Sequence, residues 1–421
     1  MPAIEPHKES FNKTNTFLLF LIGLNFMSWF YYLIILAFIK IALFSKSSRQ
    51  KNISINTVLI FLFCSFYCLF APPDVLYGFN AVIKIFSIYL AFVVGRRIVE
   101  TDGISTKVVI HYTIVLAIGT TLLGALSLIS NIRNYGLFGF ERIMPEFWTG
   151  NMLNATSQSA LFLLLSGVSF YVLIIMKKQY LLKIAVFTGI GFLLLNALLT
   201  SSRTAIIYPV AAFVISYFSY MFLSKKINLG NFIFLNLILV TLFVLYQNNV
   251  WNIQNVLTQL PLFQRVTNEI YIPLNEDERL KTYSFFVQNM ADYPFGGLNS
   301  INPIYYMHNL WLDVYAVSGI LAFLVLIVFT IRVFILIFNI LTNPDICNEF
   351  KVFLIGAYTS FILLFMTEPV LLSSPWFFMT FCLITGMTEK YHENFGSVPV
   401  VGVIGPTETN PVFEPHSLSQ E

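Results

Sequence analysis

His308 is the residue of this sequence that is best placed for acid–base chemistry. It stands with Asn309 directly before a long apolar segment, and Asp313 follows one helical turn later. An imidazole can take up or release a proton near neutral pH, so His308 could act as a general base. A half-buried histidine that only hydrogen-bonds its neighbours would fit the same position, so the surrounding sequence has to decide between the two interpretations.

Three arginines could bind an anionic substrate. Arg203 follows two serines in a turn between apolar segments, whereas Arg265 and Arg279 belong to a long polar segment. A guanidinium offers a planar fork of donors that matches phosphate oxygens, and two arginines beside a helix N-terminus could hold a pyrophosphate. For Arg203, contact with lipid headgroups is the alternative. Arg203 and Arg279 are the stronger candidates, and Arg265 is the weaker one.

Lys84 is a charged residue inside an apolar segment. A charge at the centre of a bilayer costs roughly 2.5–3.5 kcal/mol, so we expect the Lys84 side chain to face the interior of a helical bundle. Asp313 is one conceivable partner for its ammonium group, but no feature of the sequence brings the two residues together.

The composition is that of an integral membrane protein. Hydrophobic residues make up 57% of the 421 residues, charged residues only 11%, and the mean hydropathy is +0.76, a balance that soluble domains do not need. The net charge of +3 is too small to indicate nucleic-acid binding. Cys64, Cys68 and Cys382 lie in apolar segments, where neither a disulfide framework nor a zinc site is expected. We therefore expect no metal and no cofactor.

The apolar segments predict an all-α fold, a polytopic transmembrane helical bundle. About 20 apolar residues carry a helix across a bilayer, where every backbone group must bond within its own segment, and by this measure the chain has about 11–12 spans. The predicted spans are 17–44, 55–71, 77–95, 107–130, 153–175, 181–200, 204–223, 231–247, 309–330, 351–368 and 371–388. The segment 17–44 could be one long span or a broken, half-inserted pair.

Lysine and arginine gather at alternate junctions between these spans, which predicts that those junctions are cytoplasmic. The C-terminus would then be cytoplasmic. With an odd number of spans the N-terminus would lie outside, where Lys8 and Lys13 are unfavourable, so its side stays open. The predicted parts of the chain are a polar N-terminus (1–16), transmembrane helices 1–8 (17–247), an outward loop (248–307), transmembrane helices 9–11 (308–388) and a disordered cytoplasmic tail (389–421).

The outward loop 248–307 is much longer than an ordinary connection, and such loops usually have a function. It contains the amphipathic stretch LKTYSFFVQNM, which predicts a helix lying on the membrane surface, and this stretch leads to the turn sequence YPFGG.

Three motifs follow one another in the second half of the chain: SSRTA at 201–205, DERLKTY followed by YPFGG, and His308-Asn309 followed by Gly319. In this order they resemble the O-antigen ligase and O-antigen polymerase superfamily of bacterial envelope glycosyltransferases. The resemblance covers residues 150–325 well, while the first four spans match only in being apolar. Tyr283 and Ala322 depart from the usual family residues, and Ala322 slightly disfavours the ligase.

The resemblance implies a metal-independent, inverting glycosyltransferase of the bacterial inner membrane. It implies transfer of a glycan from undecaprenyl pyrophosphate to a sugar hydroxyl on the periplasmic side, where 248–307 would be the periplasmic loop. His308 would be the catalytic base, and Arg203, Arg279, Arg265 and Asn309 would bind the pyrophosphate and substrate. The expected partners are the lipid-linked glycan, an acceptor glycan or lipid A-core, and membrane lipid; a chain-length regulator is a further candidate.

Two activities fit this resemblance, and one rival belongs to another class. A polymerase of O-antigen or capsule repeat units is favoured over the O-antigen ligase, which attaches the finished glycan to lipid A-core. The rival is a transporter or flippase for lipid-linked sugars. Such a protein would have charged or helix-breaking residues at mid-membrane in paired positions of two related halves, a pattern that Lys84 alone does not make.

Overall fold

The computed structural model describes residues 11–44, 53–73, 79–136, 143–224, 248, 278–298 and 307–395, and only the backbone of 44, 278–280 and 395. Arg265 and the predicted span 231–247 lie outside the described residues.

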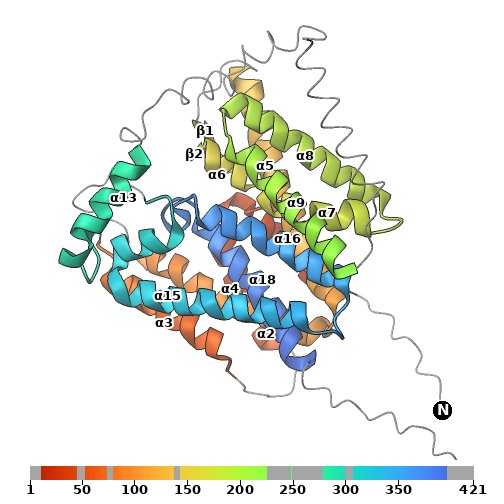
Figure 1. Cartoon of the computed structure of the whole chain (residues 1–421), viewed down its shortest axis with the longest axis horizontal. Coiled ribbons are helices and arrows are strands. Elements are labelled where there is room, and N and C mark those ends of the chain that lie inside the picture. Colours follow the sequence, from red (N-terminus) through yellow and green to blue (C-terminus); the bar gives the residue numbers. More distant parts are fainter. Residues whose placement is uncertain are drawn as a thin grey trace, which may run out of the picture.

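The described chain is mostly helical, which confirms the all-α part of the predicted fold class (Figure 1). The predicted 11–12 spans and the outward loop stay predictions. The elements are α1 (Lys13–Gly23), η1 (Phe26–Ser28), α2 (Phe30–Phe44), α3 (Ile55–Phe70), α4 (Phe79–Asp102), α5 (Thr106–Tyr135), β1 (Ile143–Pro145), β2 (Met152–Asn154), α6 (Ala155–Ala160), α7 (Leu163–Phe170), η2 (Tyr171–Ile175), α8 (Tyr180–Thr200), α9 (Thr204–Ser224), α13 (Glu278–Asn289), η5 (Met290–Asp292), α15 (Leu310–Thr342), α16 (Asn348–Phe365), α17 (Val370–Ser373) and α18 (Pro375–Phe395). The two strands pair as an antiparallel hairpin.

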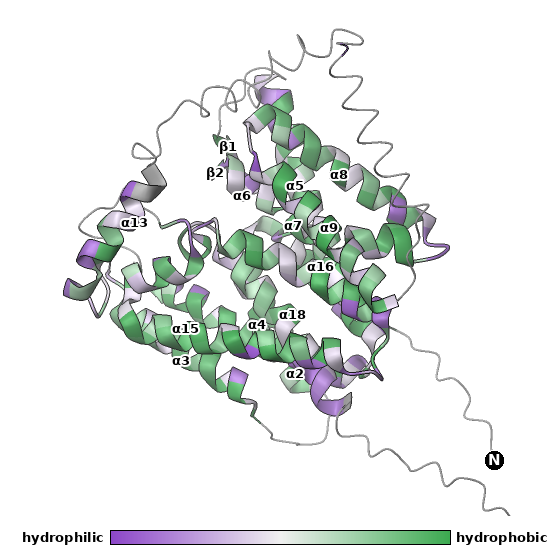
Figure 2. Ribbon diagram, in the orientation of Figure 1, coloured by the Kyte–Doolittle hydropathy of each residue, from purple (hydrophilic) through white to green (hydrophobic). Residues whose placement is uncertain are grey.

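Among the described residues, six helical segments are long and apolar enough to cross a membrane. They are α5, the continuous segment from α6 to η2, α8, α9, α15 and α16, and α2 and α3 supply shorter apolar helices. Figure 2 shows apolar residues over most of the helical surface, with polar residues gathered on α13 and at the helix ends. This distribution suits helices whose middle parts lie in lipid and whose ends meet water.

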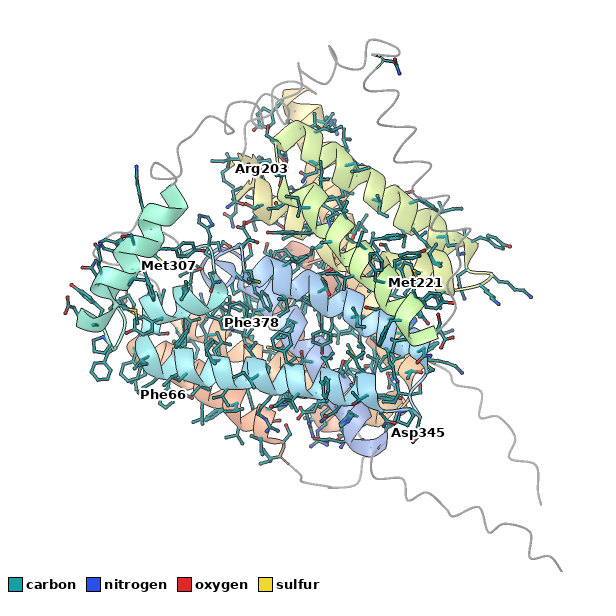
Figure 3. The ribbon with its side chains drawn as sticks, in the orientation of Figure 1. Phe66, Arg203, Met221, Met307, Asp345 and Phe378 are labelled. Carbon is teal, nitrogen blue, oxygen red and sulfur yellow. The ribbon has the colours of Figure 1, made fainter. Side chains whose placement is uncertain are left out.

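The ends of the helices gather at two opposite sides of the molecule, which we call the basic end and the loop end. At the basic end, Arg332 of α15 donates to Asn56 of α3 at 2.8 Å, and Arg96 of α4 pairs with Glu389 of α18 at 2.9 Å. At the loop end, Ser159 of α6 donates to Ser202, between α8 and α9, at 2.8 Å. In Figure 3, Arg203 and Met307 lie toward the loop end, and Met221 and Asp345 lie toward the basic end.

The segment predicted as one span, 17–44, is a broken pair of helices. Asn15, in the first turn of α1, donates to Asp102 at 2.8 Å and accepts from Lys40, near the end of α2, at 2.5 Å. The break between the helices carries three left-handed residues, and there Ser28 donates to Glu146 beside the β-hairpin at 3.3 Å. Both outer ends of the pair therefore lie at the basic end, and only the break approaches the loop end.

Glycines bring three helix crossings to backbone contact. A Cβ atom on Gly167 of α7 would meet the backbone of Gly356 of α16, and the reverse also holds. In two further helix pairs a Cβ atom on a glycine would also meet the backbone of the partner helix, at Gly23 and Gly119 (α1 with α5) and at Gly95 and Gly386 (α4 with α18). Small residues that let backbones approach closely are typical of helix pairs in membranes, where burial of apolar surface gives little driving force.

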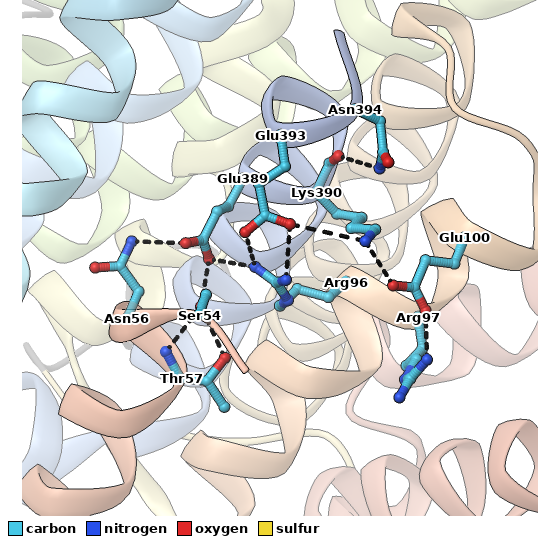
Figure 4. Close-up of polar contacts among 10 residues, drawn as sticks. All are labelled: Ser54, Asn56, Thr57, Arg96, Arg97, Glu100, Glu389, Lys390, Glu393 and Asn394. Atoms are coloured by element: carbon cyan, nitrogen blue, oxygen red, sulfur yellow. Dashed lines mark hydrogen bonds and ion pairs between the residues drawn. The ribbon is translucent and has the colours of Figure 1, made fainter. Parts of the chain in front are cut away.

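An ion-pair network ties α4 to α18 at the basic end (Figure 4). Arg96, with only 8% of its side chain exposed, pairs with Glu389 and Glu393, and Lys390 pairs with Glu100 at 2.8 Å. The prediction that residues from 389 onward form a disordered tail is wrong for the residues up to 395, and these contacts give the reason. Because its charged last turns are neutralised by α4, α18 remains helical as far as Phe395.

Candidate active site

His308 stands immediately before α15, and two polar side chains fix this position. Asn309 is the N-cap of α15, and its Oδ1 accepts from the backbone N–H groups of Trp311 and Leu312, both at 3.2 Å. Asp313, which is 1% exposed, accepts from the backbone N–H groups of Met307 at 2.8 Å and of Asn309 at 3.3 Å. The backbone on both sides of His308 is therefore held by the carboxylate of Asp313.

The backbone of His308 itself is left-handed, with φ 47°. This conformation costs a non-glycine residue of order 1–3 kcal/mol and persists where the surrounding contacts require it. Here the hydrogen bonds from Met307 and Asn309 to Asp313 hold the backbone of His308 in this conformation. The imidazole is half-buried at the loop end.

The YPFGG turn docks on a break in α15. Gly319 interrupts the helix with φ 77°, and across the break the N–H of Ile320 donates to the carbonyl of Pro294 at 2.8 Å. On the other side, the N–H of Gly297 donates to the carbonyl of Val317 at 3.1 Å. A Cβ atom on Gly319 would overlap the backbone of the turn, and one on Gly296 would overlap the backbone of α15. Two of the motifs found in the sequence thus form a single joint.

α13 packs on the first part of α15, beside this joint. The rings of Phe286 and Tyr315 meet edge to face at 5.4 Å, and the hydroxyl of Tyr315 donates to the carbonyl of Met290 at 2.8 Å. Met307 and Leu298 are buried in the same apolar cluster. Arg279 lies in the first turn of α13, where the backbone alone is described. The helix that carries Arg279 is therefore attached to the segment that carries His308.

Arg203 begins α9 at the loop end. Its carbonyl accepts from the N–H groups of Ile206 and Ile207, and its side chain is exposed. The preceding turn is buried, because Ser202 is 2% exposed and is hydrogen-bonded to Ser159 of α6. Arg203 therefore stands at a helix N-terminus on a fixed turn, and helix N-termini favour anions.

A buried polar contact connects α9 with the end of α16. The hydroxyls of Tyr208 in α9 and Thr367, directly after α16, are hydrogen-bonded. The next residue, Glu368, is 2% exposed. The helix that follows Arg203 is thus fixed to the end of α16.

The structure brings some of the predicted site residues together and leaves others apart. His308 and Asn309 lie side by side before α15, and Arg203 lies at the same end of the molecule before α9, which packs on α16 (Figure 3). Asn309 uses its side-chain oxygen as a helix cap, so any contact with a substrate would come from its Nδ2. The side chain of Arg279 and all of Arg265 lie outside the described part of the chain.

Lys84 lines a cavity of about 580 Å³ at the loop end. Its Nζ lies 5.4 Å from the centre of the Tyr31 ring, and no residue in the described part of the chain forms an ion pair with it. Its side chain is exposed into this open cavity, so the expectation that Lys84 faces the interior of the bundle stays a prediction. Asp313, which was named as a conceivable partner of Lys84, instead accepts from the backbone N–H groups of Met307 and Asn309.

Two buried carboxylates were not identified as site residues in the sequence. Glu368 follows the end of α16 and is 2% exposed, and Glu146 reaches the cavity only because the β-hairpin folds against the break between α1 and α2. An acidic residue next to an apolar segment was the available signal in both cases. Within the described residues, no three metal-ligating side chains converge.

Comparison with known proteins adds no assignment: no family model matches the chain, and no curated protein matches it.

Proposed function

We propose that this protein is a membrane glycosyltransferase that transfers an undecaprenyl-pyrophosphate-linked oligosaccharide to the hydroxyl of an acceptor sugar. The single observation that carries the proposal is the joint between the YPFGG turn and Gly319. Through this joint, α13, which carries Arg279 in its first turn, is attached to the segment that presents His308. A candidate base and a candidate phosphate-binding arginine therefore belong to one packed unit at the loop end.

The proposed reaction needs a base and a set of positive charges. His308 removes the proton of the acceptor hydroxyl while its oxygen attacks the anomeric carbon of the donor sugar. The bond from that carbon to the phosphate oxygen breaks, and undecaprenyl pyrophosphate leaves with the electron pair. Arg203 and Arg279 stabilise the charge that develops on the leaving pyrophosphate. Attack from the face opposite the leaving group inverts the anomeric configuration.

The proposed orientation puts the basic end in the cytoplasm and the loop end in the periplasm of a bacterium, with the helices in the inner membrane. Lys40, Arg96, Arg332 and Lys390 gather at the basic end, and lysine and arginine favour the cytoplasmic side. Because both outer ends of the α1–α2 pair lie at the basic end, the N-terminus then shares the cytoplasmic side with the C-terminal end of α18. This removes the unfavourable placement of Lys8 and Lys13.

Within this function we propose a repeat-unit polymerase for O-antigen or capsule. The ligase, which would use lipid A-core as acceptor, is the alternative, and Ala322 slightly disfavours it by comparison with the ligase motif. The two enzymes share the donor chemistry and differ in the acceptor, so the experiment has to separate them through their products.

The experiment is gel analysis of surface polysaccharide from a deletion strain that carries the wild-type gene, His308→Ala or His392→Ala. His392 is the matched control, because it is a half-buried histidine at the basic end. Equal amounts of each protein in the membrane fraction are required before the gels are compared. For a polymerase, deletion leaves a single repeat unit on the core, and the wild type and His392→Ala restore the ladder while His308→Ala does not.

Other outcomes point elsewhere. Bare core together with long chains on the lipid carrier identifies the ligase. Repeat units that accumulate on the cytoplasmic side of the membrane identify a transporter of lipid-linked sugars. Full activity of His308→Ala removes this residue from the reaction.

A further inference from the structure

The cavity at Lys84 contains two groups that the proposed reaction does not use. The first is the ammonium of Lys84, whose contact within the described part of the chain is the face of the Tyr31 ring. The second is the carboxylate of Glu146, which is 7% exposed. Its Oε2 accepts from Ser28 and Thr149, whereas among the described residues its Oε1 has no hydrogen-bond partner. A buried acceptor of this kind costs free energy unless a donor reaches it.

The walls of the cavity combine ring faces with amides and hydroxyls. Tyr31, Tyr32 and Trp376 supply the aromatic rings, and Asn80, Asn151 and Ser374 supply polar groups. Aromatic rings can pack on the apolar faces of a sugar, while amides, hydroxyls and a carboxylate hydrogen-bond its hydroxyl groups. The volume of about 580 Å³ is in the range of small-molecule sites.

The charges define the ligand more closely. A neutral sugar would satisfy Glu146 and leave the ammonium of Lys84 without a counter-charge. A bare phosphate would satisfy Lys84 and bring a second negative charge toward Glu146. A sugar ring that carries an anionic group satisfies both, because its hydroxyls can donate to Glu146 while its charge meets Lys84.

The position of the cavity relates it to His308. Tyr67 of α3 forms part of its wall, and one turn further along α3 the ring of Phe70 stacks at 5.7 Å on Phe295 of the YPFGG turn, which docks on α15, the helix that follows His308. Arg203 and Arg279 are on other helices, α9 and α13. A ligand in the cavity would therefore approach His308 from the side of α3 and α4.

We propose that this cavity is the acceptor subsite and that it binds a sugar bearing a carboxylate or a phosphate. The acceptor role rests on the proposed glycosyl transfer, whereas the binding of an anionic sugar does not.

The experiment is titration calorimetry on the purified full-length protein in detergent, in the wild type and in Lys84→Met. The probes are a glucuronic-acid-containing disaccharide, glucose 1-phosphate, the neutral disaccharide cellobiose and inorganic pyrophosphate. We expect one or both anionic sugars to bind, and Lys84→Met to weaken that binding about tenfold or more, since a charge-assisted contact is lost. Cellobiose should bind weakly and equally to both proteins. Glucuronide and glucose phosphate distinguish the two sources of negative charge.

Lys183→Met is the matched control, because Lys183 belongs to the first turn of α8 and lies away from the cavity. It should bind every probe as the wild type does. Lys84→Met removes an exposed side chain, and an unchanged melting temperature verifies its fold. Glu146→Gln is a second test variant, and it should weaken the binding of all the sugar probes.

Two results overturn the proposal: no anionic sugar binds the wild type, or Lys84→Met binds them all unchanged. Pyrophosphate that binds in a Lys84-dependent way while the sugars do not would show a phosphate site instead. Failure of the transferase proposal is distinguishable, because calorimetry is independent of turnover. If transfer is observed, Lys84→Met should raise KM for the acceptor and leave KM for the lipid-linked donor unchanged.

Discussion

Arg279 is the residue whose chemistry can be tested most directly by a conservative change. We predict that Arg279→Lys has a rate lower by about 10²-fold, because lysine keeps the charge and loses the planar fork that holds two phosphate oxygens at once. Lys281→Arg, an exposed position on the same helix, should keep wild-type activity. The measurement is polysaccharide ladder formation at matched expression. Wild-type activity in Arg279→Ala would exclude Arg279 from the site.

Around His308, the sequence predicted the residue and missed its support. The position of His308-Asn309 before an apolar segment was sufficient to locate the start of α15. The capping role of Asn309 could also have been read there, since asparagine before a helix is a common N-cap. The hydrogen bonds of Asp313 to the backbone N–H groups of Met307 and Asn309 could not be predicted, because they depend on the left-handed backbone of His308.

At the scale of elements, the joint between the YPFGG turn and α15 depends on glycine. We predict that Gly319→Ala lowers the stability by about 1–3 kcal/mol, because alanine would be strained at φ 77° and its Cβ would overlap the turn. Activity should fall with it, since the joint connects His308 to α13. The measurement is the melting temperature in detergent together with ladder formation.

Gly191→Ala is the control for this substitution. A Cβ atom at Gly191, within α8, would meet nothing within 4 Å, so alanine should be neutral or slightly stabilising there. A Gly319→Ala protein that melts like the wild type would contradict the proposed joint.

The ion-pair network between α4 and α18 predicts a dependence on pH. Burial acts to raise the pKa of Glu100, but its ion pairs with Lys390 and Arg97 prevail and lower it below the usual 4.5. The pairs therefore stabilise the fold above the unfolded pKa, and this stabilisation is lost as the pH falls through the folded value. We predict that Glu100→Gln costs about 1–2 kcal/mol at pH 7 and that its difference from the wild type shrinks toward pH 4.

Melting curves of the wild type and Glu100→Gln over this pH range make the measurement. Asp345→Asn, an exposed change at the basic end, should give a difference that stays near zero. A difference for Glu100→Gln that is constant from pH 7 to pH 4 would mean that the carboxylate charge does not contribute.

The same network shows why one boundary was misplaced. The charged residues from Glu389 onward are typical of a solvated tail, and the sequence contains no sign that α4 brings Arg96 and Glu100 against them. The middle parts of the helices were easier to predict from the sequence, and α5, α8 and α9 follow the predicted spans closely. The break between α1 and α2 contains neither proline nor glycine, so only the excess length of 17–44 indicated it.

For the whole molecule, the α1–α2 pair predicts that α1 begins on the same side of the membrane as α16. In a background without Cys68, native Cys347 marks the basic end, and Thr14→Cys and Met152→Cys add exposed positions near the start of α1 and in the β-hairpin. We predict that a membrane-impermeant thiol reagent labels Met152→Cys in intact cells. Thr14→Cys and Cys347 should be labelled only in inverted vesicles.

The labelling result has a clear contrary outcome. If Thr14→Cys is labelled in intact cells together with Met152→Cys, the pair crosses the membrane once and the proposed orientation of the N-terminus is wrong. The hydrogen bonds that join Asn15 to Asp102 and Lys40 would then not form in the cell.

The crossing of α7 and α16 carries a consequence for how such sequences can diverge. Gly167 and Gly356 each occupy the space that a side chain on the other would need. A larger residue at one position cannot be accommodated by a smaller residue at the other, because glycine is already the smallest residue. Descendants of this chain can therefore replace these glycines only if the two helices first move apart, so both positions should stay unchanged for as long as the crossing itself is inherited.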